Sequence, residues 1–211
     1  MFLLVGERVY SQAQDIGNLE CAVCGKSEPF RHITETNYFC LFGIRLLKVN
    51  QYANYYRCER CGNSYSSESS DLPSQVESVQ EVIAYILLGY GKYEEIDLAK
   101  DIALKVSNFE MQVDTLKDLT RQFSASNVDI LEQLRRAAFH INLVGKQQIV
   151  EAAFLATHAC CEIQFEDKTR INLMGNALGL SIEFVNQVVK SVRANDCYGV
   201  RRVLPISPTD S

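Results

Sequence analysis

The 211-residue sequence lacks a long apolar run, and it lacks a strong charge of one sign. No segment approaches the ~18 uninterrupted apolar residues of a transmembrane helix. The apolar residues 1–5 have no basic region before them and no small-residue cleavage site after them, so they do not match a signal peptide and favour a first strand. The formal net charge of −5 gives no overall sign of nucleic-acid or membrane binding. With 47% hydrophobic and 22% charged residues, the composition excludes a disordered or collagen-like chain and is typical of one or two folded domains.

The sequence also lacks the local motifs of the common enzyme classes. It contains no Gly-x-Ser-x-Gly, no P-loop, no dinucleotide-binding glycine pattern and no His-Glu-x-x-His. Carboxylate pairs such as Glu94–Glu95 lie at expected helix starts, where the helix dipole is sufficient to explain them. We therefore predict that the protein is not an enzyme.

What the sequence does contain is eight cysteines, four of which form two Cys-x-x-Cys-Gly motifs. Two thiolates three residues apart can reach one centre from a tight turn, and the glycine that follows accepts a backbone conformation that side chains resist. Two such motifs supply four soft ligands in a tetrahedron, as Zn²⁺ accepts in a closed structural site. We predict one structural Zn²⁺ held by Cys21, Cys24, Cys58 and Cys61, with a rubredoxin-like iron centre on the same ligands as the alternative.

The other cysteines show no pairing period. Without an export signal we expect a reducing, cytoplasmic location. In such a compartment, Cys-x-x-Cys pairs are expected to bind metal rather than to form disulfides. Cys160 and Cys161 are adjacent and are expected to pack as small hydrophobic residues, and His140 is expected as a packed, hydrogen-bonded histidine. Cys40 has no second cysteine at motif spacing and is left out of the metal site, and the role of Cys197 stays open.

The composition changes near residue 65. Residues 1–65 are rich in aromatic and β-branched residues and carry 7 basic and 6 acidic side chains, a balance of +1, which leaves 14 basic and 20 acidic side chains, a balance of −6, for the remainder. A serine-rich polar stretch at the join is typical of a linker. We predict a metal-binding β domain over residues 1–65, a linker over 66–73, a helical domain over 74–193 and an irregular tail over 194–211.

Apolar spacing predicts the elements of both parts. Residues 2–9 and 52–58 suit short strands, and residues 30–49 are strand-like with a break at Gly43. Seven helices joined by short loops, which must pack as a bundle, are expected from about Val76 onward and at 94–106, 109–123, 127–143, 146–160, 166–178 and 182–193. Asn108, Ser126 and Ser181 are expected to cap helix starts, and Gly145 and Gly179 are expected to end helices. The fold class is therefore α+β, a small β domain followed by an all-α bundle.

The segment 38–44 is unusually apolar for a small β domain. It can dock on the helical part, on a second copy of the chain or on a membrane surface. Because the basic residues that a membrane surface requires are few, we favour docking on protein or packing in the core.

The two cysteine motifs and their flanks resemble a bacterial zinc-ribbon family. A short apolar strand (residues 2–6) precedes the first motif, a Tyr-Phe-Cys-Leu-Phe segment (38–42) follows it, and Tyr56 introduces the second motif as Tyr-Arg-Cys-Glu-Arg-Cys-Gly. The motif proline usual in that family is absent at Ala22 and Glu59. The resemblance covers about residues 1–65 and implies a structural zinc ribbon.

The helical part resembles the TerB-like tellurite-resistance fold, a seven-helix domain with an internal duplication. The segment His-Ala-Cys-Cys-Glu-Ile at 158–163, the acids that open the next helix and the Ala-Leu-Gly-Leu-Ser at 177–181 carry this resemblance. In that family an Ala-Asp-Gly-Glu-Ile stretch carries acidic residues linked to divalent-metal binding. Cys160 and Cys161 stand where its Asp and Gly would be, and Glu162, Glu166 and Asp167 form the candidate second cation site that the resemblance implies.

We predict a non-enzymatic, zinc-binding interaction or adaptor protein with a protein partner, and a homo-oligomer is compatible with this prediction. A role in a metal- or envelope-stress response is implied by the family resemblance alone. One alternative is a nucleic-acid-binding regulator that uses the basic residues and tyrosines of the ribbon, although a balance of +1 is a weak electrostatic footprint. The other is a divalent-cation sensor that uses the acidic residues of the helical part.

Overall fold

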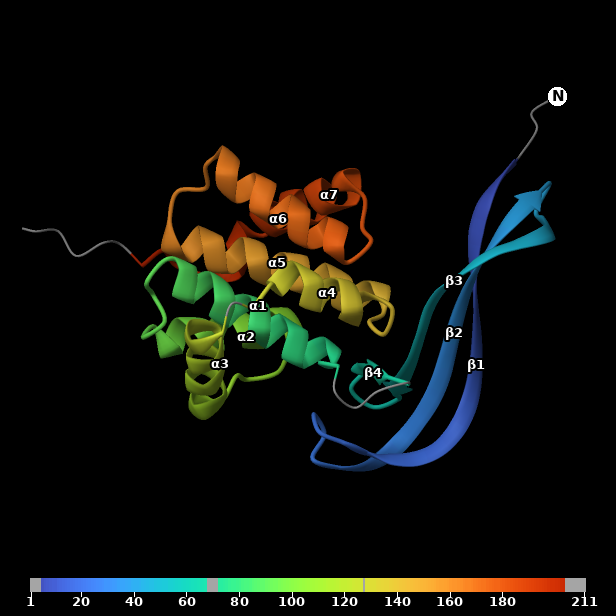
Figure 1. The fold of residues 1–211 in the computed structure, drawn as a ribbon, viewed down its shortest axis with the longest axis horizontal. Coiled ribbons are helices and arrows are strands. Elements are labelled where there is room, and N and C mark those ends of the chain that lie inside the picture. The colour runs from blue at the N-terminus through green and yellow to red at the C-terminus, as the bar shows by residue number, and fades with distance from the viewer. Residues whose placement is uncertain (1–4, 68–71, 127, 204–211) are drawn as a thin grey trace, which may run out of the picture. The chain divides into compact units, whose positions relative to one another are not determined.

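The computed structural model of the chain describes residues 5–67, 72–126 and 128–203 (Figure 1). Parts of the predicted elements therefore lie outside the described residues, namely 2–4 of the first strand, 68–71 of the linker, Asn127 and 204–211 of the tail. The chain divides into two compact units. The β unit consists of Met1–Gln75 with Arg136–Gly145, and the helical unit consists of Val76–Arg135 with Lys146–Ser211.

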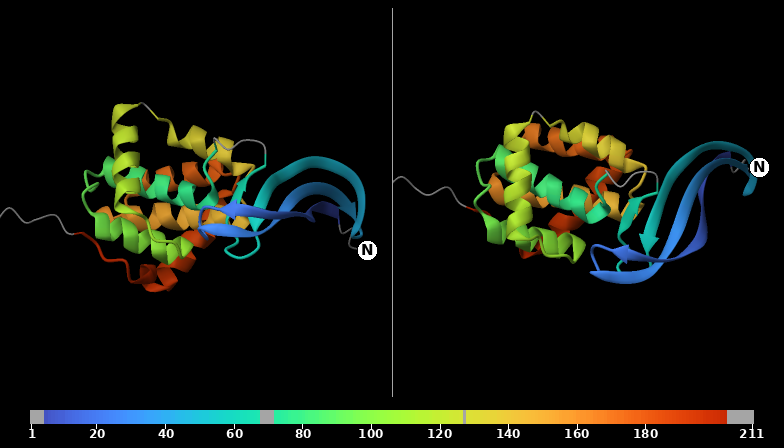
Figure 2. Two further views of the ribbon diagram at one scale, coloured as in Figure 1. Left: turned by 90° about the horizontal axis from the view of Figure 1, so that it is seen from below. Right: turned by 60° about the horizontal axis from the view of Figure 1, so that its bottom comes forward.

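The β unit contains a four-stranded antiparallel sheet with strand order β1-β2-β3-β4. The strands are β1 (Val5–Cys21), β2 (Lys26–Leu41), β3 (Ile44–Cys58) and β4 (Ser64–Ser66). At about 3.3 Å per residue, the 16 residues of β2 extend over about 50 Å. Figures 1 and 2 show the three long strands side by side in a strongly curved sheet. Together with the seven helices described later in this section, this sheet makes the fold α+β, as predicted.

The break expected at Gly43 is confirmed as the turn between β2 and β3. Phe42 and Gly43 adopt positive φ angles of 51° and 83°, which a two-residue hairpin turn requires. The strands themselves are longer than the sequence predicted. Residues 11–15 of β1 are polar apart from Ala13 and have little strand propensity, but each pairs with a residue of β2 in a continuous ladder. This pairing outweighs the local preference.

The core of the β unit is thin. One buried cluster is formed by Cys21, Phe30 and Cys58, and a second is formed by Ile33, Ala53 and Tyr55. Most of β1 and the first half of β3 remain exposed. A single-layer sheet with two small clusters buries little apolar area, so the unit needs a further source of stability.

The turn between α4 (Ile130–Ala138) and α5 (Leu143–Cys160) belongs to the β unit. The Asn54 amide donates a hydrogen bond to the Phe139 carbonyl at 2.9 Å. His140 Nδ1 donates to the Asn54 carbonyl at 2.9 Å, and the side chain is only 5% exposed. The structure therefore places His140 in a packed, hydrogen-bonded position, as predicted.

Asn142 is the hub of a polar network in the same unit. Its Nδ2 atom donates to Ser64 Oγ at 3.2 Å and to Gln75 Oε1 at 3.0 Å, and it lies 3.4 Å from the carbonyl of Gly62. Its Oδ1 atom accepts from the Gly145 amide at 2.8 Å. One side chain thus connects the second cysteine motif, β4 and the starts of α1 and α5. No sequence pattern predicted this network.

Within the described residues there are seven α-helices, as the apolar spacing predicted. Besides α4 and α5 they are α1 (Gln75–Gly89), α2 (Ile96–Ser107), α3 (Val113–Ala125), α6 (Phe165–Ala177) and α7 (Ile182–Ala194). A short 3₁₀ turn follows at Asp196–Gly199. α5 is buried on almost every side over residues 149–157, which is the pattern of a central helix (Figure 1). None of the helices described is long and apolar enough to cross a membrane.

Several helix ends differ from prediction. Asn108 does not start a helix but ends α2 in the left-handed conformation, with φ 56°, a conformation that asparagine tolerates better than most residues. Ser126 ends α3, and Gly145 lies inside the first turn of α5 rather than stopping a helix. Ser181 caps α7 by accepting a hydrogen bond from the Phe184 amide, and Gly179 follows α6 with φ 76°, both as predicted.

Gly175 allows α6 and α7 to approach closely. A Cβ atom at this position would overlap Cγ2 of Val185, which is 1% exposed. We predict that Gly175→Ala lowers the free energy of unfolding by a net ~1–2 kcal/mol, because overpacking outweighs the gain in helix propensity. Gly89→Ala is the matched control, because its Cβ would meet no atom within 4 Å. Chemical denaturation of both variants tests this, and equal stability of Gly175→Ala and wild type would contradict it.

Candidate metal centre

The first cysteine motif forms the turn between β1 and β2. Cys21 is the last residue of β1, and the Gly25 amide donates to the Cys21 carbonyl at 2.8 Å. Gly25 has a φ of 67°, a left-handed conformation that strains residues with a side chain. The Cys24 amide points to Cys21 Sγ at 3.4 Å, so the turn also places a backbone donor beside a sulfur.

The second motif repeats this geometry at the end of β3. Cys58 is the last residue of β3, the Gly62 amide donates to the Cys58 carbonyl at 2.9 Å, and Gly62 has a φ of 76°. The Glu59 amide donates to the Pro29 carbonyl at 2.9 Å, which ties this turn to β2. Both glycines thus have the role that the spacing predicted.

The four sulfur atoms converge on one point. The Sγ atoms of Cys21, Cys24, Cys58 and Cys61 all lie within 4.8 Å of one another. The Cys21–Cys61 and Cys24–Cys58 separations are 3.6 Å and 3.9 Å. A tetrahedron with metal–sulfur bonds of about 2.3 Å has edges of about 3.8 Å, so the arrangement fits Zn²⁺.

The pKa values of the cysteine thiols also favour a bound cation at this site. Burial raises the pKa of Cys21, but hydrogen bonds from Tyr65 and from the Cys24 amide outweigh it and lower that pKa to about 7. Burial and the neighbouring thiols raise the pKa values of Cys24 and Cys61. The Cys21 thiolate therefore forms easily, whereas Cys24 and Cys61 ionise more readily when a positive charge lies between the sulfurs.

Aromatic and charged side chains surround the sulfurs. The Tyr65 hydroxyl lies 3.3 Å from Cys21 Sγ, and its ring packs against Phe30 with centroids 5.6 Å apart. Arg60 pairs with Glu28 at 2.8 Å beside the second motif. Sequence reasoning missed Tyr65, although its position four residues after Cys61 was a signal for it.

The site has the features of a structural centre. Cys21 and Cys58 are at most 1% exposed, and Cys61 is the exposed corner. Four thiolates fill the tetrahedron and leave no position for a water or substrate. The zinc ion therefore supplies folding energy to the thin-cored β unit rather than reactivity.

Glu162, Glu166 and Asp167 are not brought together as one ligand group within the described residues. Asp167 is 8% exposed and completes the capping box of α6 by accepting from the Gln164 amide at 2.9 Å. It also accepts from the Tyr90 hydroxyl; burial raises the pKa of Asp167, but this bond, the Gln164 amide and the Arg170 charge together outweigh burial and lower that pKa. Glu162 and Glu166 are exposed. The structure gives Asp167 a helix-capping role.

Cys160 lies at the end of α5 and Cys161 follows it. Both are half-buried, and burial raises the pKa of Cys160 to about 11. A protonated thiol is a poor nucleophile, which agrees with the packing role that we expected.

Comparison with known proteins supports the metal centre. A family model of the zinc-ribbon family matches residues 19–101, a span that contains both cysteine motifs and extends into α2. The match covers less than half of the chain. No curated protein and no solved structure matches. The match shows that this part of the chain is similar to the zinc-ribbon family, and together with the four converging sulfurs it supports one structural Zn²⁺.

Removal of one ligand tests the structural role of the metal. We predict that Cys24→Ala loses the bound zinc and unfolds the β unit, because three thiolates in a thin core do not hold the ion as a closed site. Cys40→Ala is the matched control, because Cys40 is a 2% exposed cysteine of the same sheet outside the metal site. Metal analysis and amide NMR dispersion measure both properties. An ordered β unit in zinc-free Cys24→Ala protein would contradict the prediction.

Tyr65→Phe tests the hydrogen bond to the sulfur. The ring can still pack on Phe30, so we predict an intact fold with zinc affinity reduced about 10- to 100-fold. Tyr56→Phe is the control, because Tyr56 packs on the same cluster and its hydroxyl forms no hydrogen bond with the described residues. Competition with a metal chelator measures both affinities, and equal affinities would refute a role for the Tyr65 hydroxyl.

Proposed function

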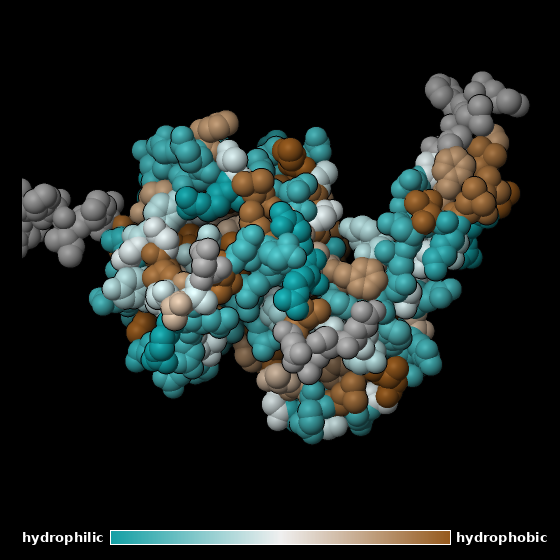
Figure 3. All heavy atoms as spheres, viewed as in Figure 1, coloured by the Kyte–Doolittle hydropathy of each residue, from teal (hydrophilic) through white to brown (hydrophobic). Residues whose placement is uncertain are grey.

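We propose that this protein is a non-enzymatic interaction or adaptor protein whose zinc ion holds a β-ribbon in shape so that its far end contacts another molecule. The observation that carries this proposal is an apolar patch at the β2–β3 turn, here called the hairpin tip, which consists of Phe42, Ile44, Leu46, Leu47 and Val49. These side chains are 49–67% exposed, and hydrophobic residues gather at this end of the sheet in Figure 3. A cluster of exposed large apolar side chains marks a contact surface.

The exposure of the tip corrects part of the sequence interpretation. Core packing was one of the two roles favoured for residues 38–44, and Cys40 is indeed buried. Phe42 and Ile44, however, are 57% and 66% exposed in the described structure. They lie at a hairpin turn, where a single-layer sheet has no second layer to cover them.

Ion pairing argues against nucleic acid as the partner of the zinc end. Arg31 lies 2.7 Å from Asp15, Arg57 lies 2.9 Å from Glu59, and Arg60 pairs with Glu28. Cations already paired with carboxylates are poor partners for phosphates. A nucleic-acid regulator that uses these residues is therefore the weaker candidate.

The remaining parts of the proposal rest on sequence. The absence of enzyme motifs supports a non-enzymatic role, and the cysteine usage supports a reducing, cytoplasmic location. Seven helices and the Leu-Gly-Leu-Ser at 178–181 support the TerB-like resemblance of the helical unit, and with it a metal- or envelope-stress response. A protein partner for the helical unit is part of the adaptor role.

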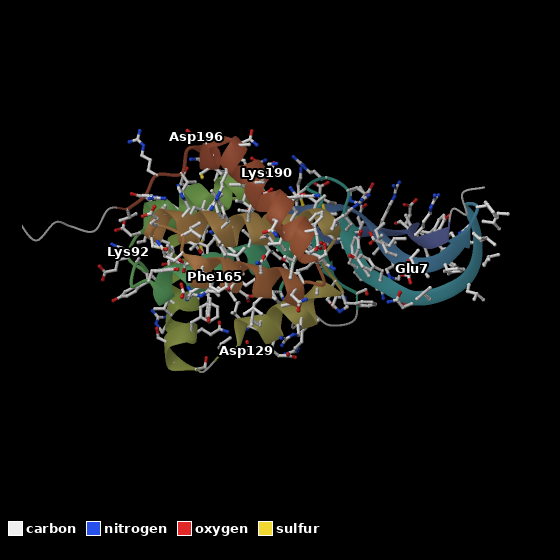
Figure 4. The ribbon with its side chains drawn as sticks, turned by 90° about the horizontal axis from the view of Figure 1, so that it is seen from above. Glu7, Lys92, Asp129, Phe165, Lys190 and Asp196 are labelled. Carbon is white, nitrogen blue, oxygen red and sulfur yellow. The ribbon has the colours of Figure 1, made fainter. Side chains whose placement is uncertain are left out.

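Comparison of what co-purifies with full-length variants from the native cell tests the proposal. The double variant Phe42→Asn/Leu47→Asp removes apolar area from the tip, and Asn suits the positive φ of Phe42. We predict that at least one component, protein or membrane, bound by wild type is lost. Phe165→Asn/Leu173→Asp is the control, because both residues are exposed on α6, where Figure 4 labels Phe165. An identical set of bound components for wild type and the tip variant would contradict the proposal.

A further inference from the structure

We infer that the hairpin tip binds the surface of an anionic lipid bilayer. This inference rests on the proposed function, in which the tip makes a contact, and it names the chemistry of that contact. Three features of the described residues support it: the separation of apolar and cationic side chains across the sheet, the absence of acidic residues between Thr36 and Cys58, and an aromatic layer behind the tip.

The register of the strands separates two kinds of side chain. Partners in a ladder share a face, so Ile44 opposite Leu41 and Leu47 opposite Phe39 form one apolar face. Val9, 48% exposed and opposite Asn37, extends this face on β1. Leu46 lies at a register shift between β2 and β3, and Phe42 lies at the turn. Apolar side chains therefore cover the end of the hairpin and most of this face, apart from Glu7 opposite Phe39 and the pair Asn37 and Asn50.

The opposite face carries cations. Arg45 pairs with Cys40, and Arg8 and Lys48 both pair with Tyr38, so the three cations share the second face. None of them forms an ion pair with the described residues. A β-hairpin with an apolar face and a cationic face has the distribution of an interfacial amphipathic element, which places apolar side chains among acyl chains and cations at the headgroups.

The charge of this region is opposite in sign to that of the whole chain. From Thr36 to Cys58 the sequence contains no Asp or Glu, whereas the chain has a net charge of −5. The nearest acid on β1 is Glu7, which accepts a hydrogen bond from Asn37 (Figure 4 shows Glu7 on β1). Each cation close to an anionic leaflet raises affinity about fivefold, so three unpaired cations supply a substantial part of the attraction.

Two tyrosines form a layer behind the tip. Tyr10 and Tyr38 meet edge to face with centroids 5.7 Å apart, and the Arg45 guanidinium lies 4.5 Å from the Tyr10 centroid and 5.7 Å from the Tyr38 centroid. Tyrosine is enriched at the boundary between acyl chains and water. The order apolar tip, then tyrosine and arginine, then polar sheet follows the change in polarity across a membrane surface.

Other occupants use less of this surface. A second copy could cover the apolar face but would leave the three cations without acidic partners. Addition of a strand to β3 is disfavoured, because three register shifts interrupt its ladder with β2 and its free edge carries Lys48. Nucleic acid would use the cations but not the aliphatic side chains. An anionic bilayer matches both.

Vesicle co-sedimentation of the full-length, zinc-loaded protein tests the inference. We predict binding to vesicles of phosphatidylcholine mixed with phosphatidylglycerol, weaker binding to phosphatidylcholine alone, and weaker binding as the salt concentration rises. Phe42→Asn/Leu47→Asp should reduce affinity at least about tenfold, because a large apolar side chain that leaves water contributes at least that factor. Phe165→Asn/Leu173→Asp should bind as wild type does.

A second pair of variants tests the charge. Arg8→Gln/Lys48→Gln should reduce affinity for the anionic vesicles about 25-fold and leave affinity for phosphatidylcholine unchanged. Lys117→Gln/Lys190→Gln removes the same charge from exposed positions of the helical unit and should have little effect.

Three results would overturn the inference: wild type that binds neither vesicle, tip variants that bind as their controls do, or a dimer that the tip variant dissociates in the absence of vesicle binding. If the protein does not bind vesicles but a protein from native cells co-purifies with wild type and not with the tip variant, the lipid inference is wrong and the proposed function stands. If no component depends on the tip, the proposed function fails as well.

Discussion

The repulsion between four cysteine sulfurs is the interaction on which the β unit depends. Sulfurs within 4.8 Å of one another can all be thiolates only around a cation, and the raised pKa values of Cys24 and Cys61 express this constraint. Because Cys21 ends β1 and Cys58 ends β3, the ion joins the ends of two strands that lie on either side of β2. The sheet is thus closed at one end by a metal rather than by a packed core.

The two ends of the sheet consequently differ in chemistry. At the zinc end, Phe30, Tyr65 and the cysteines form a buried cluster, and nearby arginines are paired with carboxylates. At the β2–β3 turn, apolar side chains are exposed, and so are cations that form no ion pair with the described residues. About 50 Å of strand separates them along β2. The zinc end, whose side chains are buried or ion-paired within the β unit, provides stability. The β2–β3 turn, whose apolar and cationic side chains are exposed, is the end that can contact a partner.

Local features of the sequence predicted the parts of this structure that depend on local contacts. The cysteine spacing and Gly25 and Gly62 identified the metal centre because each turn is built within five residues, and apolar spacing located all seven helices within the described residues. Helix ends were less predictable, since Asn108 can end a helix as well as begin one. The Asn142 network and the length of β1 were not predictable, because both depend on partners far away in the chain. The acidic residues near 162–167 show the limit of a resemblance, because Asp167 serves the start of α6.

A metal centre also explains how the tip can stay exposed. A three-stranded sheet stabilised by hydrophobic packing alone must place one face against a second layer, and that layer would cover the side chains of one face along its whole length. Four thiolates and one ion stabilise the sheet from its end, and large apolar side chains near the turn remain exposed. The apolar face with Leu47 and the cationic face with Arg45 can therefore coexist on one hairpin. An interface between acyl chains and water requires this arrangement, whereas a strand pair buried in a core could not keep its cations.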